Sequence, residues 1–274
     1  MELSMPTIKR LLLAVSMSCL VATANAAPMD DAAAAYLRGD YAQTLKILRP
    51  LAEQGNADAQ FSLGAAYYYG HGVTQDYQEA LKWYGLAAAQ GDVRAQYNIG
   101  YMHYHKSQGV TQDYQEALKW FRLAAAQGES NAQTQIGVMY HSGERVPQDY
   151  QEALKWFRLA ANQGYANAQS NIGYMYENGQ GVTQDYQEAL KWYRLAADQG
   201  FAGAQSNIGE LYYKGQGVIQ DYASAHMWWN LASSAGEASG AKNRDLIAQK
   251  MTPQQIEKAQ DMARKCQERN FKGC

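Results

Sequence analysis

The sequence predicts an all-α protein, a solenoid in which pairs of helices are stacked along the chain. The stretch "GVTQDYQEALKWYRLAA" at residues 181–197 recurs almost unchanged at 72–88 and 109–125, with a close variant at 146–161. The opening aspartates of the repeats are 37, 36, 36 and 36 residues apart, and a fixed period in the thirties is typical of helix-pair repeats. Apolar residues make up 47% of the chain, enough for a folded protein. The aspartates are Asp76, Asp113, Asp149, Asp185 and Asp221.

Residues 1–26 read as a secretory signal peptide. Lys9 and Arg10 precede the apolar run at 11–24, and the small-x-small sequence "ANA" follows. We expect cleavage after Ala26, which leaves no transmembrane segment in the mature chain and places it in the periplasm or outside the cell. The alternative is a lipoprotein anchored at Cys19, but the residues before Cys19 lack the usual leucine.

The second helix of each repeat is predicted to begin at the repeated Asp-Tyr-Gln-Glu. Asp76 can accept a backbone N–H bond as the N-cap, and Glu79 can reach back to complete a capping box. Leu81 and Tyr84 then fall with several alanines on one helical face, which predicts an apolar stripe. Gly91 follows as a left-handed cap.

The first helix of each repeat is typified by "AQSNIGYMY", residues 168–176. A glycine in the middle of this helix costs about 1 kcal/mol relative to alanine. Because it recurs in every repeat, we expect it to permit close approach of the partner helix. These glycines are Gly64, Gly100, Gly137, Gly173 and Gly209.

All six tryptophans lie in second helices. A ladder of tryptophans could line a ligand groove, but identity in every repeat favours packing between repeats. They are Trp83, Trp120, Trp156, Trp192, Trp228 and Trp229.

The pattern resembles the Sel-1-like repeat, a relative of the tetratricopeptide repeat. Small, aromatic and glycine positions match the family together in "AQSNIGYMYENGQGVTQDYQEALKWYRLAADQG", residues 168–200, and in its counterparts. The resemblance implies a right-handed α/α solenoid of antiparallel helix pairs that binds other proteins. It divides the chain into N-terminal capping helices (27–55) and five repeats. The repeats span residues 56–91, 92–128, 129–164, 165–200 and 201–236.

The tail, residues 237–274, leaves the period and is predicted to form a helical cap over the end of the stack. Thr252 followed by Pro253 is a strong helix start. Once the leader is removed, only Cys266 and Cys274 remain, which predicts one disulfide in an oxidising compartment. Two free thiols are the alternative and do not fit an exported chain.

Two loops depart from the family pattern. The second repeat has one extra residue and lacks a glycine in "HYHKSQGV", residues 103–110, and the third repeat has Arg145 where glycine stands elsewhere. The chain also lacks the cysteine pairs that bridge the helices of the cysteine-rich exported branch of the family. The penicillin-related activities of that branch are therefore not carried over to this chain.

The sequence predicts no catalytic residue, no metal ligand and no cofactor. It contains no H-E-x-x-H, C-x-x-C or G-x-S-x-G motif and no phosphate-binding loop. His103 and His105 are two residues apart and would diverge on a helix. The formal net charge of −2 gives no basic surface for nucleic acid.

A partner-binding surface is predicted where the repeats differ. Interior positions repeat, but a stripe on the first helices varies, and in tetratricopeptide-like stacks this stripe lines the concave face. Aromatic residues gather in the stripes of the first two repeats, which favours protein recognition. The alternative is solvated variation with a few half-buried tyrosines. The predicted contact residues are Phe61, Tyr68, Tyr69, Arg94, Tyr97, Tyr101, Tyr104 and His105.

Two functions follow from these patterns. The first is an exported, non-enzymatic scaffold that binds a protein or peptide, with envelope or host-surface proteins as partners. The second is a cell-wall or penicillin-interacting enzyme, by analogy with the cysteine-rich branch. A nucleophile paired with a base would mark the second function, and labelling with a fluorescent penicillin distinguishes the two.

Overall fold

The computed structural model describes residues 27–105, 109–143 and 146–274, and within these ranges every regular element is a helix. The expected leader with Cys19, the middle of the loop at 103–110, and Arg145 lie outside the described residues. The chain divides within one helix into two compact units, an N-terminal unit up to Ala124 and a C-terminal unit of Ala125–Cys274. No helix in the described ranges is long and apolar enough to cross a membrane.

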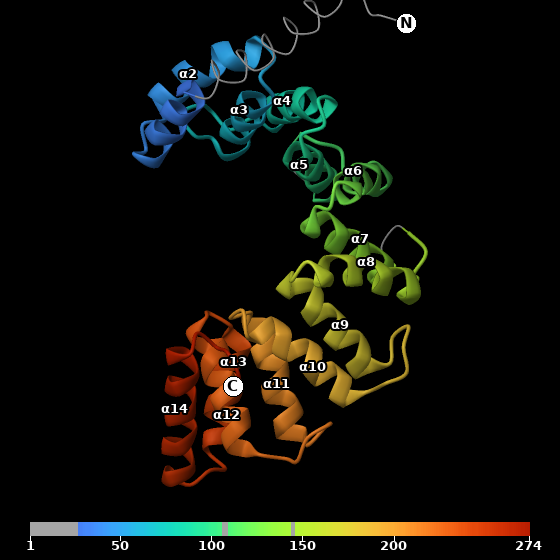
Figure 1. Ribbon diagram of the computed structural model, residues 1–274, viewed down its shortest axis with the longest axis vertical. Helices are drawn as coiled ribbons and strands as arrows, with labels where there is room; N and C mark the ends of the chain where they lie inside the picture. The colour runs from blue at the N-terminus through green and yellow to red at the C-terminus, as the bar shows by residue number, and fades with distance from the viewer. Residues whose placement is uncertain (1–26, 106–108, 144–145) are drawn as a thin grey trace, which may run out of the picture. The chain divides into compact units, whose positions relative to one another are not determined.

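The N-terminal unit contains the capping helices and the first two helix pairs (Figure 1). Residues 27–37 are helical and precede α2. Helix α2 packs against α3, α3 against α4, and α4 against α5. The helices are α2 (Tyr41–Glu53), α3 (Ala57–Tyr69), α4 (Tyr77–Ala89), α5 (Val93–Tyr104) and α6 (Tyr114–Ala126), with the division between units inside α6.

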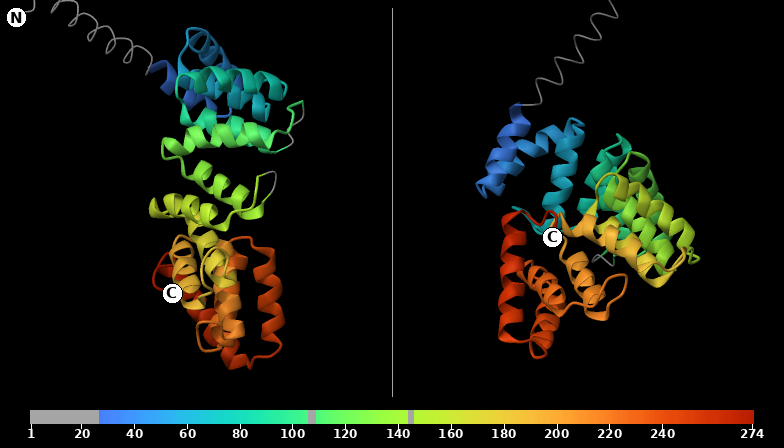
Figure 2. Two further views of the ribbon diagram at one scale, coloured as in Figure 1. Left: turned by 90° about the vertical axis from the view of Figure 1, so that its right-hand side faces the viewer. Right: turned by 60° about the horizontal axis from the view of Figure 1, so that its bottom comes forward.

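The C-terminal unit contains three further helix pairs and two final helices (Figure 2). From α7 to α13 each helix packs against the next, and α14 packs against α12. The predicted all-α solenoid of helix pairs is thereby confirmed. The helices are α7 (Ser130–Ser142), α8 (Tyr150–Asn162), α9 (Ala166–Asn178), α10 (Tyr186–Ala197), α11 (Ala202–Lys214), α12 (Tyr222–Ser234), α13 (Ala238–Ala248) and α14 (Pro253–Glu268).

The repeated aspartates cap the second helices as expected. The Asp76 carboxylate accepts hydrogen bonds from the backbone N–H groups of Gln78 and Glu79. The predicted capping-box bond, from the Asp76 N–H to the Glu79 carboxylate, is wrong. The Asp76 N–H donates instead to the Tyr67 carbonyl (3.0 Å), and the Glu79 carboxylate pairs with Lys82 (3.1 Å). The backbone bond from Asp76 therefore ties the second helix of the repeat back to the first.

The mid-helix glycines permit close approach, and what approaches is an aromatic ring. A Cβ on Gly173 would lie 2.7 Å from Tyr193 Cδ1, a separation that real Cβ atoms essentially never show. The same arrangement recurs in every repeat, between Gly64 and Tyr84, Gly100 and Phe121, Gly137 and Phe157, and Gly209 and Trp229.

Buried glutamines join successive helix pairs, a role that the sequence analysis did not assign. Gln60 Nε2 donates to the Ala52 carbonyl (3.0 Å), and Gln90 Nε2 donates to Gln60 Oε1 (2.8 Å). The second kind of bond recurs from Gln163 to Gln133 and from Gln199 to Gln169. Within the described chain, the fully buried side-chain amide of Gln205 has no such partner. The position that would supply the donating glutamine, 36 residues after Gln199, is occupied by Ala235.

Trp83, Trp120 and Trp192 pack between repeats, as expected, whereas Trp229 packs within its own repeat against Gly209. Trp120 of α6 contacts the core formed by α4 and α5, and Trp192 of α10 contacts the core formed by α8 and α9. In the last repeat, α14 lies along α12 (Figure 1) and covers Met227 and Leu231. The tail therefore closes the end of the stack.

Candidate functional site

All eight predicted contact residues lie in the N-terminal unit, on α3, on α5 and just after α5. The Tyr69 side chain is 62% exposed, Arg94 and His105 are also exposed, and the other five are half-buried. We call these eight residues the aromatic surface. They are Phe61, Tyr68, Tyr69, Arg94, Tyr97, Tyr101, Tyr104 and His105.

Rings of the aromatic surface contact one another. The Tyr101 and His105 ring centres are 4.2 Å apart, and those of Tyr68 and Tyr69 are 4.9 Å apart. Burial, with a smaller contribution from the Tyr101 hydroxyl, raises the pKa of Tyr68, so the stripes of α3 and α5 are close enough to interact electrostatically. Although His105 is exposed, packing against Tyr101 and Tyr104 partly desolvates its ring and lowers the pKa of the imidazole.

Arg94 is held rather than free. Its guanidinium lies 4.3 Å from the centre of the Phe61 ring, a cation–π contact that links α5 to α3. The same guanidinium forms ion pairs with Asp58 and Asp92. Two carboxylates more than balance its charge, so Arg94 supplies a flat, fixed surface and not a site for an anion.

Part of the aromatic surface also belongs to the packing of the fold. The Tyr97 ring centre is 5.7 Å from that of Phe121, and the Tyr104 ring centre is 6.3 Å from it. On α5, these two tyrosines therefore contribute to the packing of the repeat as well as to its surface. Tyr69 and Phe61, in contrast, also face a pocket that the sequence analysis missed.

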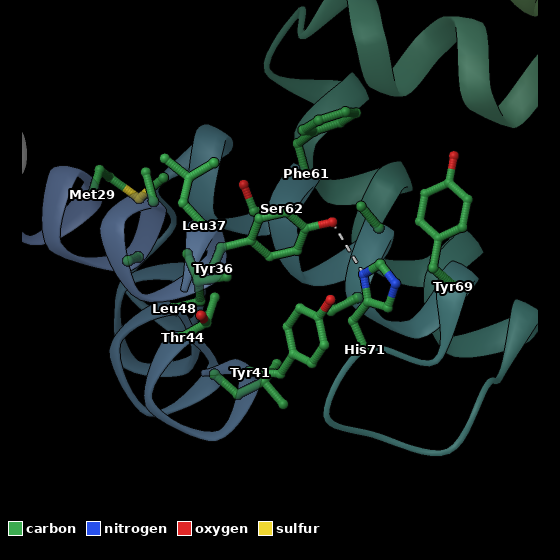
Figure 3. Close-up of a pocket in the computed structure, with 15 residues that line it drawn as sticks. Met29, Tyr36, Leu37, Tyr41, Thr44, Leu48, Phe61, Ser62, Tyr69 and His71 are labelled. Atoms are coloured by element: carbon green, nitrogen blue, oxygen red, sulfur yellow. Dashed lines mark hydrogen bonds between the residues drawn. The ribbon is translucent and has the colours of Figure 1, made fainter. Parts of the chain in front are cut away.

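This pocket has a volume of about 360 Å³ and lies between residues 27–37, α2 and α3 (Figure 3). Among the described residues, no Asp, Glu, Lys or Arg side chain lines it. The Tyr36 hydroxyl lies 3.2 Å from His71 Nδ1, and the His71 ring stacks on the Tyr41 ring at 4.7 Å. The sequence predicted capping helices at 27–55 and no site there, because a pocket between helices leaves no motif in the repeat pattern.

A polar cluster occupies the corresponding face of the C-terminal unit. The Tyr193 hydroxyl donates to Glu177 Oε2 (2.7 Å), and Lys214 pairs with Glu210 (2.6 Å). Burial raises the pKa of Glu177, and nearby Glu210 raises it further. In this cluster the phenol is paired with one acid and the lysine with the other.

A second, smaller pocket of about 290 Å³ lies in the C-terminal unit, between α11, α12 and α13. Lys250 Nζ lies 3.3 Å from the Tyr213 hydroxyl at its edge. In the described ranges, no group of three or more His, Cys, Asp or Glu side chains is placed to hold a metal ion.

A family model described as Sel1 repeat matches five consecutive segments of the chain, residues 57–92, 93–129, 130–165, 166–201 and 202–237. The chain belongs to the Sel1 repeat family. The described helix pairs form the scaffold fold of this family, which typically serves protein interaction. A search among curated proteins gave no match.

Solved structures of Sel1 repeat proteins are similar to this one. A Sel1 repeat protein from Oxalobacter formigenes is 29% identical with a TM-score of 0.75, over 86% of this chain and 96% of that chain. A protective antigen of uropathogenic Escherichia coli, which displays an SLR fold, is 30% identical with a TM-score of 0.53, over 85% and 58%. An immunity protein from Pseudomonas aeruginosa is 22% identical with a TM-score of 0.51, over 76% and 83%, and shares the fold alone.

Proposed function

We propose that this Sel1 repeat protein is an exported, non-enzymatic scaffold that binds a protein or peptide through the first-helix face of its first two repeats. The aromatic surface carries this proposal. It combines exposed and half-buried rings with a charge-balanced arginine, the composition that is enriched at the centres of protein interfaces.

The rings are also well prepared for binding. Neighbouring rings and ion pairs restrict Tyr68, Arg94 and Tyr101 before any partner arrives, so less side-chain entropy is lost on association. The polar cluster around Glu177 on the equivalent face of the C-terminal unit lacks this density of rings.

Export is supported by the basic and apolar leader at 1–26 and by the pair Cys266 and Cys274. The periplasm and the cell exterior both fit these features. Fractionation of the native cells, followed by N-terminal sequencing, tests this part of the proposal, and a full-length protein in the cytosol would contradict it.

The binding surface is tested with Tyr101→Ala and a matched control, Tyr174→Ala. Tyr174 occupies the same repeat position on α9 and is 44% exposed. A partner is first captured from the native envelope, and its affinity for each variant is then measured by calorimetry. Tyr101→Ala should weaken binding about tenfold or more, and Tyr174→Ala should change it little. Equal affinities for Tyr101→Ala and the unaltered protein would place the site elsewhere.

A further inference from the structure

We propose that the pocket between residues 27–37, α2 and α3 binds an uncharged aromatic ring that carries a hydroxyl group, as a phenol does. The proposal goes beyond the scaffold function, because it stands on the geometry of the pocket itself. The ring can belong to a free phenol or to a tyrosine side chain of a peptide.

Equivalent positions in the repeats indicate why this pocket exists. Each second helix in the five repeats places an aromatic ring at one position, against the mid-helix glycine of its partner. Leu48 occupies that position on α2, 36 residues before Tyr84. The N-terminal cap therefore lacks the ring that fills each repeat. The rings in the repeats are those of Tyr84, Phe121, Phe157, Tyr193 and Trp229.

The repeats also show what the polar end of the missing ring would meet. The side chain of Asn98 on the next first helix lies close enough to the Tyr84 hydroxyl to lower its pKa, and Asn207 does the same for Tyr193, whose hydroxyl also donates to Glu177. Ser62 lies 36 residues before Asn98 and lines the pocket (Figure 3). A phenol in the position of the missing ring would therefore meet a hydroxyl group where Tyr84 meets an amide.

Size and charge select the ligand further. The pocket volume of about 360 Å³ lies within the range of small-molecule sites. Its described lining holds no Asp, Glu, Lys or Arg side chain that could pair with a charged ligand, so burying a charge there would be costly. The rings of Tyr36, Tyr41 and His71 form one wall, which favours the edge and face contacts of another ring.

The first experiment titrates p-cresol, the side-chain analogue of tyrosine, into the purified protein and follows binding by NMR. We expect saturable binding with a Kd of about 1 mM or tighter, the range open to a ligand of this size. Its saturated analogue 4-methylcyclohexanol should bind at least about fivefold more weakly, because it lacks the ring faces. No saturable binding of p-cresol, or equal binding of both compounds, would overturn the proposal.

Variants then locate the site. Leu48→Tyr supplies the missing ring from the chain itself and should weaken p-cresol binding about tenfold or more while raising the melting temperature. If that variant does not fold, Ala33→Leu at the exposed edge of the pocket should weaken binding similarly. Unchanged binding by whichever of these variants folds would exclude this pocket.

A reciprocal variant tests the equivalence of the positions. Tyr193→Leu removes the ring of the fourth repeat and leaves Glu177 and Asn207 as polar groups at the vacated site. This variant should bind a second equivalent of p-cresol and recover part of its lost melting temperature, as engineered apolar cavities bind small aromatic compounds. Absence of a second equivalent would show that Leu48 does not explain the pocket.

Titration of N-acetyl-tyrosinamide distinguishes a free phenol from a tyrosine side chain as the natural ligand. Binding of this compound favours a peptide ligand, whereas binding of p-cresol alone favours a free phenol.

Discussion

The ring of Tyr193 lies so close to Gly173 that a Cβ on the glycine would stand 2.7 Å from ring carbon Cδ1. The glycine and the ring, 20 residues apart in the sequence, therefore constrain one another. Because the same pair recurs in every repeat, the distance between the two helices of a pair is set by a ring thickness.

Gly173→Ala is expected to destabilise the protein although alanine is the better helix former. The added methyl group overpacks the ring of Tyr193, which typically costs about 1–3 kcal/mol. Gly85→Ala is the matched control, because Gly85 also lies inside a helix but has open space where its Cβ would be. It should stabilise by up to about 1 kcal/mol. Chemical denaturation measures both, and changes of the same sign would refute the assignment.

Glu177 should make stability depend on pH. Burial raises its pKa in the folded state, so the folded protein holds this proton more tightly than the unfolded chain. Its contribution is complete below the ordinary glutamate pKa and is lost as the pH rises through the raised value. The difference in unfolding free energy between Glu177→Gln and the unaltered protein should therefore shift in favour of the variant as the pH rises from 4 to 7. Urea denaturation at the two pH values measures this shift.

Tyr193→Phe provides the counterpart to that variant. In the unaltered protein, the Tyr193 hydroxyl donates to Glu177 and thereby lowers the pKa of this carboxyl. Without the hydroxyl the pKa should rise further, so the loss of stability toward neutral pH should become larger. Phenylalanine already occupies the equivalent position at Phe121 and Phe157, so the ring itself is tolerated. A pH dependence identical in all three proteins would show that Glu177 titrates normally.

Leu231 and Leu195 occupy the same repeat position in different surroundings. Leu231 is 1% exposed beneath α14, whereas Leu195 is 49% exposed. Leu231→Ala should cost about 2–5 kcal/mol, as for other buried leucines, and Leu195→Ala much less. Thermal unfolding of the two variants checks this, and similar melting temperatures would mean that α14 does not cover α12 in solution.

Cys266 and Cys274 form a disulfide after the last helix, with Cα atoms 5.6 Å apart. Closing so short a loop contributes about 2.5 kcal/mol in the chain-entropy treatment. Cys274→Ser should release residues 270–274 and leave the helix content intact, whereas Cys266→Ser also disturbs a buried side chain. Circular dichroism and limited proteolysis measure the two effects. A large loss of helix in Cys274→Ser would mean that the end of the chain is required for folding.

The fold was predictable because its determinants are local and repeated. The cap at Asp76, the glycine at Gly64 and the ring at Tyr84 return at a fixed period, so each repeat tests the interpretation of the others. The eight residues of the aromatic surface could be placed on neighbouring first helices for the same reason. Their ring contacts, and the neutralisation of Arg94 by Asp58, depend on spacing between helices that periodicity does not give.

Features set by a departure from the repeat were harder to predict. Leu48 lines the pocket at the position equivalent to Tyr84, and this equivalence becomes informative only once the structure shows the Tyr84 ring packed against Gly64. Glu79 was assigned to a capping box because the spacing fits, but the Asp76 N–H already bonds to the first helix of its repeat. In both cases a partner outside the local segment decides the outcome.

The way α14 closes the stack has a consequence for how such a chain can change its length. Helix α14 covers α12, and one of the covered residues is Met227. The preceding repeat has a lysine, Lys191, at the same position. The repeats upstream of α12 do not carry this substitution. Duplication of a 36-residue genetic segment such as residues 149–184 would thus insert one more pair of helices and leave both specialised ends unaltered. Unequal recombination could then enlarge or shorten the protein in whole steps, with no compensating mutation at its terminus.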